Sequence, residues 1–285
     1  QRQMCIRDRN YTMSHKIAGI GGVVGFVSIG GATLRDCSSS ILTQLAVQCK
    51  KSNGYAHHMG GIAGFIAGGE SEISGCTNTG EIDNEHYNNN PWKSEGLQSG
   101  SIGGIIGAYA YNNDYEASIK VENCSNTAGL RSSRGMAGGI SGYLRNGEIS
   151  GCNNTGTMAN GTRSYVAGIV GVVEHVSIDN CTAVCNVAGT SAGSEVFSGG
   201  GIVGILYDGS SCTNSSFYGS IVSTTTTAGE TAGGIAGSSA AGTSISGCKF
   251  GGAVRGTDIT DSNYSSYVAG DSNAQVSSCS YWDGK

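Results

Sequence analysis

Residues 60–82, GGIAGFIAGGESEISGCTNTGEI, contain the pattern from which the fold of this chain can be predicted. It opens on Gly60-Gly61-Ile62-Ala63-Gly64, and this pattern recurs along the sequence at spacings of 29 to 43 residues. Seven copies make a chance recurrence untenable, so the chain is a repeat protein. The copies occupy residues 21–25, 60–64, 103–107, 138–142, 167–171, 200–204 and 233–237.

Each copy is short, β-branched and bounded by glycine, which is typical of a strand. A second motif follows, in which Ile or Val precedes Cys by three residues, as in Ile73-x-x-Cys76. Side chains on a strand alternate with a period of two, so both ends of this motif face inward only if the chain bends between them. The residue before the cysteine is often one that tolerates a left-handed backbone: Gly75, Asn123, Gly151, Asn180 and Gly247.

A turn signal comes next, at Asn78-Thr79-Gly80 and Asn154-Thr155-Gly156, before a short strand that carries Ile82 or Met158. Strand, corner, strand, turn and strand make one coil, which begins with the Gly-Gly-Ile-x-Gly strand. We therefore predict an all-β fold, a right-handed parallel β-helix (β-solenoid) with three-faced coils. About eight coils, stacked at about 4.8 Å, would form a rod of roughly 40 Å.

The composition excludes several other classes of protein. Gly supplies 49 residues and Pro only 1, without a three-residue period, which excludes a collagen triple helix. Charged residues make up 13% and hydrophobic residues 38%, so disorder driven by charge is not expected. The net charge of −5, without a basic stripe, argues against nucleic acid as a partner. No apolar run is long enough to predict membrane insertion within this segment.

The sequence predicts one domain. Residues 1–9 share neither the composition nor the repeat pattern of the other residues, and they resemble a translated adapter sequence, so we interpret them as a non-native leader. Residues 10–285 then form a single β-solenoid repeat domain. Because the last copy, near Val268, is degraded, we interpret the chain as a fragment of a larger protein with additional domains.

The repeated residues resemble the GLUG-motif repeat, whose pattern runs Gly-Gly-Leu/Ile-x-Gly, Ile-x-x-Cys and Thr-Gly-x-Val/Ile. Residues 60–82 and 138–158 match it almost throughout, and weaker copies cover about residues 17–282. Such repeats occur in large bacterial surface proteins, including adhesin-like chains and the non-catalytic region of immunoglobulin A-cleaving metalloproteases. The resemblance therefore implies a secreted or cell-surface bacterial setting. This chain has no His-Glu-x-x-His zinc motif, so it does not carry the protease activity of that family.

Eight of the 11 cysteines are expected to stack in one structural column inside the coils, although Cys212 lacks the preceding Ile. Stacked Cα atoms about 4.8 Å apart lie within the disulfide range, but parallel side chains make the required torsion difficult. Free buried thiols are the favoured interpretation, and disulfides stay open. The spacing predicts no metal site, and nothing indicates a cofactor. The column comprises Cys37, Cys76, Cys124, Cys152, Cys181, Cys212, Cys248 and Cys279.

Candidate binding residues lie in the longest insertion. Glu81, Asp83 and Glu85 alternate with Ile82 and would form an outward stripe of carboxylates, the side chains that glycosidases use. An ordinary solvated edge explains this stripe equally well. Tyr87, Trp92 and Lys93 come next, and an exposed aromatic residue among amides is suited to a sugar or a protein partner.

The insertions at residues 83–99, 190–198, 224–231 and 257–267 occupy equivalent places in their coils, so we expect them along one edge. The Gly-Gly-Ile strands are also apolar on both sides, as in Ile62, Ile66 and Phe65, which predicts that their outer face is covered.

Three functions fit this sequence. The leading hypothesis is a non-enzymatic cell-surface solenoid for adhesion or ligand display, which binds a host or surface glycan or protein through the loops. The first alternative is a carbohydrate-active β-helix, similar to a polysaccharide lyase or hydrolase, that uses the region from Glu81 to Glu85. The second is a passive structural stalk of a larger surface protein.

Overall fold

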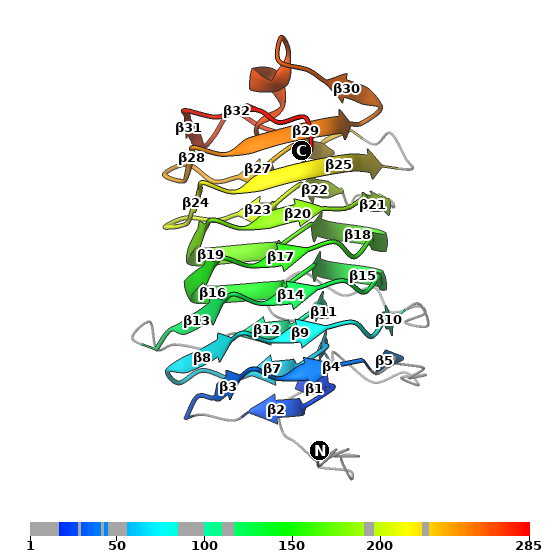
Figure 1. Ribbon diagram of the computed structural model, residues 1–285, viewed down its shortest axis with the longest axis vertical. Helices are drawn as coiled ribbons and strands as arrows, with labels where there is room; N and C mark the ends of the chain where they lie inside the picture. The colour runs from blue at the N-terminus through cyan, green and yellow to red at the C-terminus, as the bar shows by residue number, and fades with distance from the viewer. Residues whose placement is uncertain are drawn as a thin grey trace.

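The computed structural model describes residues 17–27, 30–40, 43–44, 56–84, 100–109, 117–190, 197–223 and 228–285. Its parallel strands stack one above another into a rod, with the N-terminus at one end and the C-terminus near the other (Figure 1). The predicted all-β solenoid of parallel strands is confirmed. The hand of the coils and their number stay predictions. The leader at residues 1–9 lies outside the described residues.

One coil holds five strand segments where three were expected. The Gly-Gly-Ile motif does not begin a single strand: β6 ends at Gly60, the chain bends at Gly61 and Ile62, and β7 starts at Ala63. The chain can bend here because glycine, which has no Cβ atom, adopts backbone conformations that other residues do not. The coil comprises β6 (Ala56–Gly60), β7 (Ala63–Ile66), β8 (Ser71–Ser74), β9 (Thr77–Asn78) and β10 (Ile82–Asn84).

Equivalent segments of successive coils pair in register and form five rows, which we number in the order of the chain. The first row comprises β1 (Ile17–Gly21), β6, β11 (Ser101–Gly103), β15 (Leu130–Gly138), β18 (Met158–Ala167), β22 (Ser198–Gly200) and β26 (Thr231–Gly233). The second row comprises β2 (Val24–Val27), β7, β12 (Ile106–Tyr109), β16 (Ser141–Ser150), β19 (Val170–Asp179), β23 (Val203–Leu206) and β27 (Ala236–Ser239).

The long strands β16 and β19 also serve the third row, and β15, β18, β25 and β29 extend into the fifth. The third row adds β3 (Thr33–Arg35), β8, β13 (Ile119–Glu122), β24 (Ser211–Thr213), β28 (Ser244–Ser246) and β31 (Gln275–Ser277). The fourth row comprises β4 (Ser38–Ser39), β9, β14 (Ser125–Asn126), β17 (Asn153–Asn154), β20 (Thr182–Val184), β25 (Ser216–Ser223), β29 (Lys249–Val254) and β32 (Ser280–Tyr281). The fifth row adds β5 (Thr43–Gln44), β10 and β21 (Val187–Thr190).

The last glycine of the motif lets the first and second rows pack backbone against backbone. A Cβ atom on Gly107 would lie 2.4 Å from the Gly64 carbonyl oxygen and 2.6 Å from the Met59 amide nitrogen. No real side chain tolerates such distances, so only glycine fits. The motif therefore encodes a close approach between two rows, in addition to a bend.

The interior of the rod is an aliphatic stack. The isoleucine of each motif is fully buried, and burial of one such side chain contributes about 1.5–3 kcal/mol. The same residue type recurs at each level, so the stack continues through the described coils. Its members are Ile62, Ile105, Ile140, Ile169, Ile202 and Ile235.

A second apolar cluster explains why the strands of the second row are apolar on both sides. Phe65 of this row is 3% exposed, and the His58 ring of the first row stacks on it at 4.7 Å between centroids. Met136 and Tyr165, also from the first row, pack in the same cluster. The outer face of the second row is thus covered, at least in part, by the first row of the same chain.

Candidate functional site

The loop-bearing edge runs between the fifth row and the first row. Asp83 of β10 pairs in register with Gln44 of β5 and Arg131 of β15. At higher levels, Ala188 of β21 pairs with Ala159 of β18 and Val222 of β25. The strands β10, β21 and β25, after which these insertions begin, therefore all end in the fifth row. In β15 and β18 the chain crosses this edge as one continuous strand.

The fourth predicted insertion, residues 257–267, lies within the described residues. It forms β30 (Thr257–Ile259), which pairs antiparallel with β29, and the 3-10 helix η2 (Tyr264–Tyr267). The Tyr264 ring meets the Phe250 ring edge to face at 6.2 Å between centroids. This insertion thus folds back onto the last coils of the rod.

Two of the predicted binding residues can be placed. Ile82 is fully buried, Glu81 is exposed and Asp83 is half-buried, as strand alternation requires. Asp83 lies beside Arg131 of the next coil, so its surroundings include a cation. Glu85, Tyr87, Trp92 and Lys93 lie outside the described residues. The carboxylate stripe is therefore seen only at its first two members.

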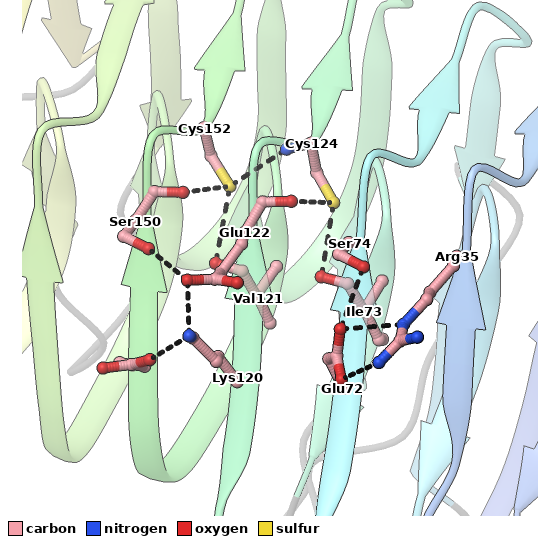
Figure 2. A network of polar contacts seen from close by, with 11 residues as sticks. Arg35, Glu72, Ile73, Ser74, Lys120, Val121, Glu122, Cys124, Ser150 and Cys152 are labelled. Atoms are coloured by element: carbon pink, nitrogen blue, oxygen red, sulfur yellow. Dashed lines mark hydrogen bonds and ion pairs between the residues drawn. The ribbon is translucent and has the colours of Figure 1, made fainter.

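The cysteines form a column on the inner side of the corner between the third and fourth rows (Figure 2). In Cys124, the thiol donates to the Glu122 carbonyl at 3.3 Å and to the Ile73 carbonyl of the preceding coil at 3.6 Å. The thiols of Cys152 and Cys181 repeat both contacts. Each of these three thiols thus has two backbone carbonyls within hydrogen-bonding distance. All cysteines of the described residues are free.

Cys212 does not belong to this column, which corrects the prediction. It lies in β24 and pairs with Ile178 and Ile245, so it occupies the isoleucine position of the Ile-x-x-Cys motif. Ser215 takes the corner position, where its hydroxyl accepts the Cys181 amide at 3.1 Å and donates to the Thr213 carbonyl at 2.8 Å. The serine hydroxyl can replace the cysteine thiol at this corner because both are small groups that donate a hydrogen bond. The Cys212 sulfur still lies 3.8 Å from that of Cys248.

The buried thiols are mostly harder to ionise than an ordinary cysteine. Hydrogen bonding with Cys124 and burial raise the pKa of Cys76 and Cys152. Burial raises the pKa of Cys185 to about 12. Cys124 differs, because hydrogen bonds from Cys152 and Cys76 lower its pKa, but its side chain is completely buried. The fully buried members of the column, Cys76, Cys124, Cys152, Cys181 and Cys248, are therefore shielded from reagents and pack as part of the core.

Outside the corner, the third row carries a ladder of opposite charges (Figure 2). Arg35 of β3 contacts Glu72 of β8 at 2.7 Å, and Lys120 of β13 contacts Glu122 at 2.7 Å and Glu148 at 3.4 Å. Hydrogen bonding to Arg35 lowers the pKa of Glu72. Solvent-exposed pairs of this kind contribute little to stability. The ladder neutralises charge between coils and leaves no concentrated patch of either sign among these residues.

An asparagine ladder was missed by the sequence analysis, which read Asn78 and Asn154 only as turn residues. Asn78 Nδ2 donates to Asn126 Oδ1 at 2.8 Å, and Asn126 Nδ2 donates to Asn154 Oδ1 at 2.8 Å. All three side chains are buried. Each Nδ2 also donates to a backbone carbonyl two residues on, so the amides are satisfied. The recurrence of asparagine two residues after the cysteine in three successive coils could have predicted this ladder.

The position that asparagine occupies in this ladder carries other residue types in the coils nearer the C-terminus. Register pairing continues the ladder from Asn154 to Ala183, Phe217 and Phe250. These later side chains are fully buried. The second glycine of the motif faces this position throughout, since its Cβ would touch Asn78 at one level and Phe217 at another. At this position the interior is therefore lined by amides from Asn78 to Asn154 and by aromatic rings at Phe217 and Phe250.

Neither a metal centre nor a helix able to span a membrane is found in the described parts of the chain. Among those residues, no three His, Cys, Asp or Glu side chains are grouped closely enough to bind a metal ion. No described helix has the length and apolarity that crossing a membrane requires. Comparison with known proteins adds no assignment: no family model, no curated protein and no solved structure matches this chain.

Proposed function

We propose that this chain is a non-enzymatic β-solenoid that displays ligand-contacting loops on a bacterial cell surface. The observation that supports the proposal is the common edge from which the insertions after β10, β21 and β25 depart. Register pairing fixes the heights at which β10, β21 and β25 end, so the core spaces the points where the insertions begin. The resemblance to GLUG repeats supports the exported setting.

The ligand of this proposal is a glycan or protein of a host or of the cell surface, and the longest loop supplies the main contact. Residues 85–99 carry Trp92, Tyr87 and Lys93, a combination of aromatic surface and a cation. Aromatic residues dominate the binding energy of many interfaces because they bury a large area at little entropic cost. Further domains of a larger polypeptide would supply anchoring.

Binding to immobilised host extracellular-matrix proteins and to a glycan array tests this proposal. We expect the full chain to bind at least one surface, and Trp92→Ala to weaken that binding at least about tenfold. Lys249→Ala, an exposed change in the fourth row, serves as the matched control and should bind like the unmodified chain. A chain that binds neither surface, or that binds equally well with residues 85–99 replaced by a Gly-Ser linker, contradicts loop-mediated display.

A further inference from the structure

A row of three side chains crosses the outer face of the second row. Arg145 of β16 pairs in register with Glu174 of β19. Tyr207, directly after β23, takes the same position in the next coil, because its amide donates to the Val173 carbonyl at 3.0 Å. The three residues come from successive coils and lie side by side.

The Glu174 carboxylate is held from two sides. Arg145 Nη2 lies 3.3 Å from Glu174 Oε1, and the Tyr143 hydroxyl donates to Glu174 Oε2 at 3.1 Å. The carboxylate side chain is 32% exposed and the guanidinium side chain 21% exposed. Both groups therefore reach solvent in a fixed geometry, and their charges cancel.

Tyr207 supplies an aromatic surface beside this pair. It is 45% exposed, which makes it one of the four large hydrophobic residues exposed among the described residues. Its neighbour in the following coil is Ala240, whose amide donates to the Leu206 carbonyl at 2.8 Å. The small Ala240 side chain does not cover the Tyr207 ring. A turn through Asp208 follows, and the Ser210 amide donates to the Tyr207 carbonyl at 3.2 Å. The turn fixes where the ring departs from the strand.

We propose that Tyr207, Glu174 and Arg145 form a flat binding site for a neutral saccharide. The apolar face of a pyranose packs on the phenol ring, while its hydroxyls donate to Glu174 and accept from Arg145. An anion is disfavoured because Glu174 already neutralises Arg145. This inference rests on the proposed display function, since it names a second contact surface and the chemical class of its ligand.

Titration calorimetry with hexasaccharides of glucose, mannose and N-acetylglucosamine tests the site. We expect one of them to bind, Tyr207→Ala to weaken that binding about tenfold or more, and Tyr207→Phe to change it by about twofold at most. Glu174→Gln keeps the shape of the carboxylate and should weaken binding by about tenfold. Val222→Ala, a change at a residue that is 41% exposed on another row, is the matched control. Thermal melts show whether each variant is folded.

The outcomes separate this inference from the proposed function. Binding of a hexasaccharide that Trp92→Ala abolishes and Tyr207→Ala leaves unchanged overturns the Tyr207 site and supports loop display. Absence of hexasaccharide binding, together with binding to a matrix protein, overturns the saccharide assignment alone. Equal weakening by Tyr207→Ala and Val222→Ala also overturns it, because the effect would then reflect a general loss of packing.

Discussion

At the scale of single residues, glycine is the most constrained position of the repeat. Gly107 lies where a Cβ would collide with the backbone of two strands, whereas the nearest atoms to a Cβ on Gly129 would be the Thr157 hydroxyl at 3.3 Å and the Thr157 carbonyl oxygen at 3.9 Å. We expect Gly107→Ala to lower the free energy of unfolding by about 1–3 kcal/mol or more, as overpacking does. Gly129→Ala, the matched control, should change it by about 0.5 kcal/mol at most. Urea denaturation measures both, and equal effects would contradict the close approach.

The asparagine ladder predicts that replacing a buried asparagine destabilises the fold far more than replacing its exposed neighbour. Asn126→Ala removes the acceptor of one Asn78 Nδ2 proton and the Asn126 donor to the Ala128 carbonyl, whereas Asn154 Oδ1 keeps the Gly156 amide as a donor. We expect a loss of about 2–4 kcal/mol in the free energy of unfolding, since each orphaned group costs about 1–3 kcal/mol. Asn153→Ala, on the exposed neighbour, should be nearly neutral. A small loss for Asn126→Ala in chemical denaturation would show that the ladder is replaceable.

The buried thiols predict a selective chemical reactivity. Alkylation of the folded chain followed by peptide mapping should label Cys37 and Cys279, which are half-buried, and spare Cys76, Cys124, Cys152, Cys181 and Cys248. The reason is access, because all five of the spared side chains are fully buried. Rapid labelling of Cys124 would indicate that the coils open at that level.

Raised thiol pKa values also give stability a pH dependence. The Cys185 pKa rises from 9.0 to about 12 on folding, so the folded chain retains a proton that the unfolded chain releases above pH 9.0. The stabilisation is complete below that pH and is lost as the pH rises toward 12. Unfolding measured between pH 8 and 10.5 should show a shallower decline for Cys185→Ala than for the unmodified chain. Parallel curves would count against this linkage.

At the scale of elements, the corner between the third and fourth rows depends on a left-handed residue. Asn123, Gly151 and Asn180 have φ values of 51°, 60° and 49°. Asn180→Val places a β-branched side chain in this region, which costs about 1–2 kcal/mol, whereas Asn180→Gly should change stability by only a few tenths. Thermal unfolding of the pair checks the expectation. Equal stability of the two variants would mean that the corner has no such requirement.

The sequence predicted this corner well because the corner depends only on residues that are close together in the sequence. A three-residue spacing and a left-handed residue determine the bend, whatever the rest of the coil does. Cys212 was misplaced because the prediction followed the cysteine and ignored its neighbours. Asn214, with φ 47°, precedes Ser215 as Asn180 precedes Cys181, so the corner was marked by the asparagine. The bend inside Gly-Gly-Ile was missed because glycine pairs also occur in straight strands with close neighbours.

At the scale of the whole molecule, the parallel strand pairings of the described residues join neighbouring coils. Stability should therefore follow the position along the rod, as in other repeat proteins. In hydrogen exchange with mass spectrometry, we expect peptides from β16 and β19 to be protected longest and those from β31, whose residues are all exposed, to exchange first. Uniform protection across the described strands would instead indicate a single cooperative unit.

Long-range placement explains what the sequence could not predict. Arg145, Glu174 and Tyr207 each lie five residues after the isoleucine of their motif copy, so the repeat spacing already aligns them in successive coils. The spacing does not show that Arg145 and the Tyr143 hydroxyl both reach the Glu174 carboxylate, because those contacts depend on side-chain conformations in adjacent coils. By contrast, Glu81 and Asp83 were predicted to face outward by alternation alone, which needs no knowledge of other coils.

The change from amides to aromatic rings along the interior means that the repeats are not interchangeable parts. A coil with Asn126 fits between neighbours that offer an amide, whereas a coil with Phe217 fits between neighbours that offer ring surface or small side chains. A duplication or exchange of coils would succeed within one half of the rod and fail across the boundary near Ala183. The order of the repeats therefore matters for their packing, and such a rod can be lengthened by copying a coil within its own half.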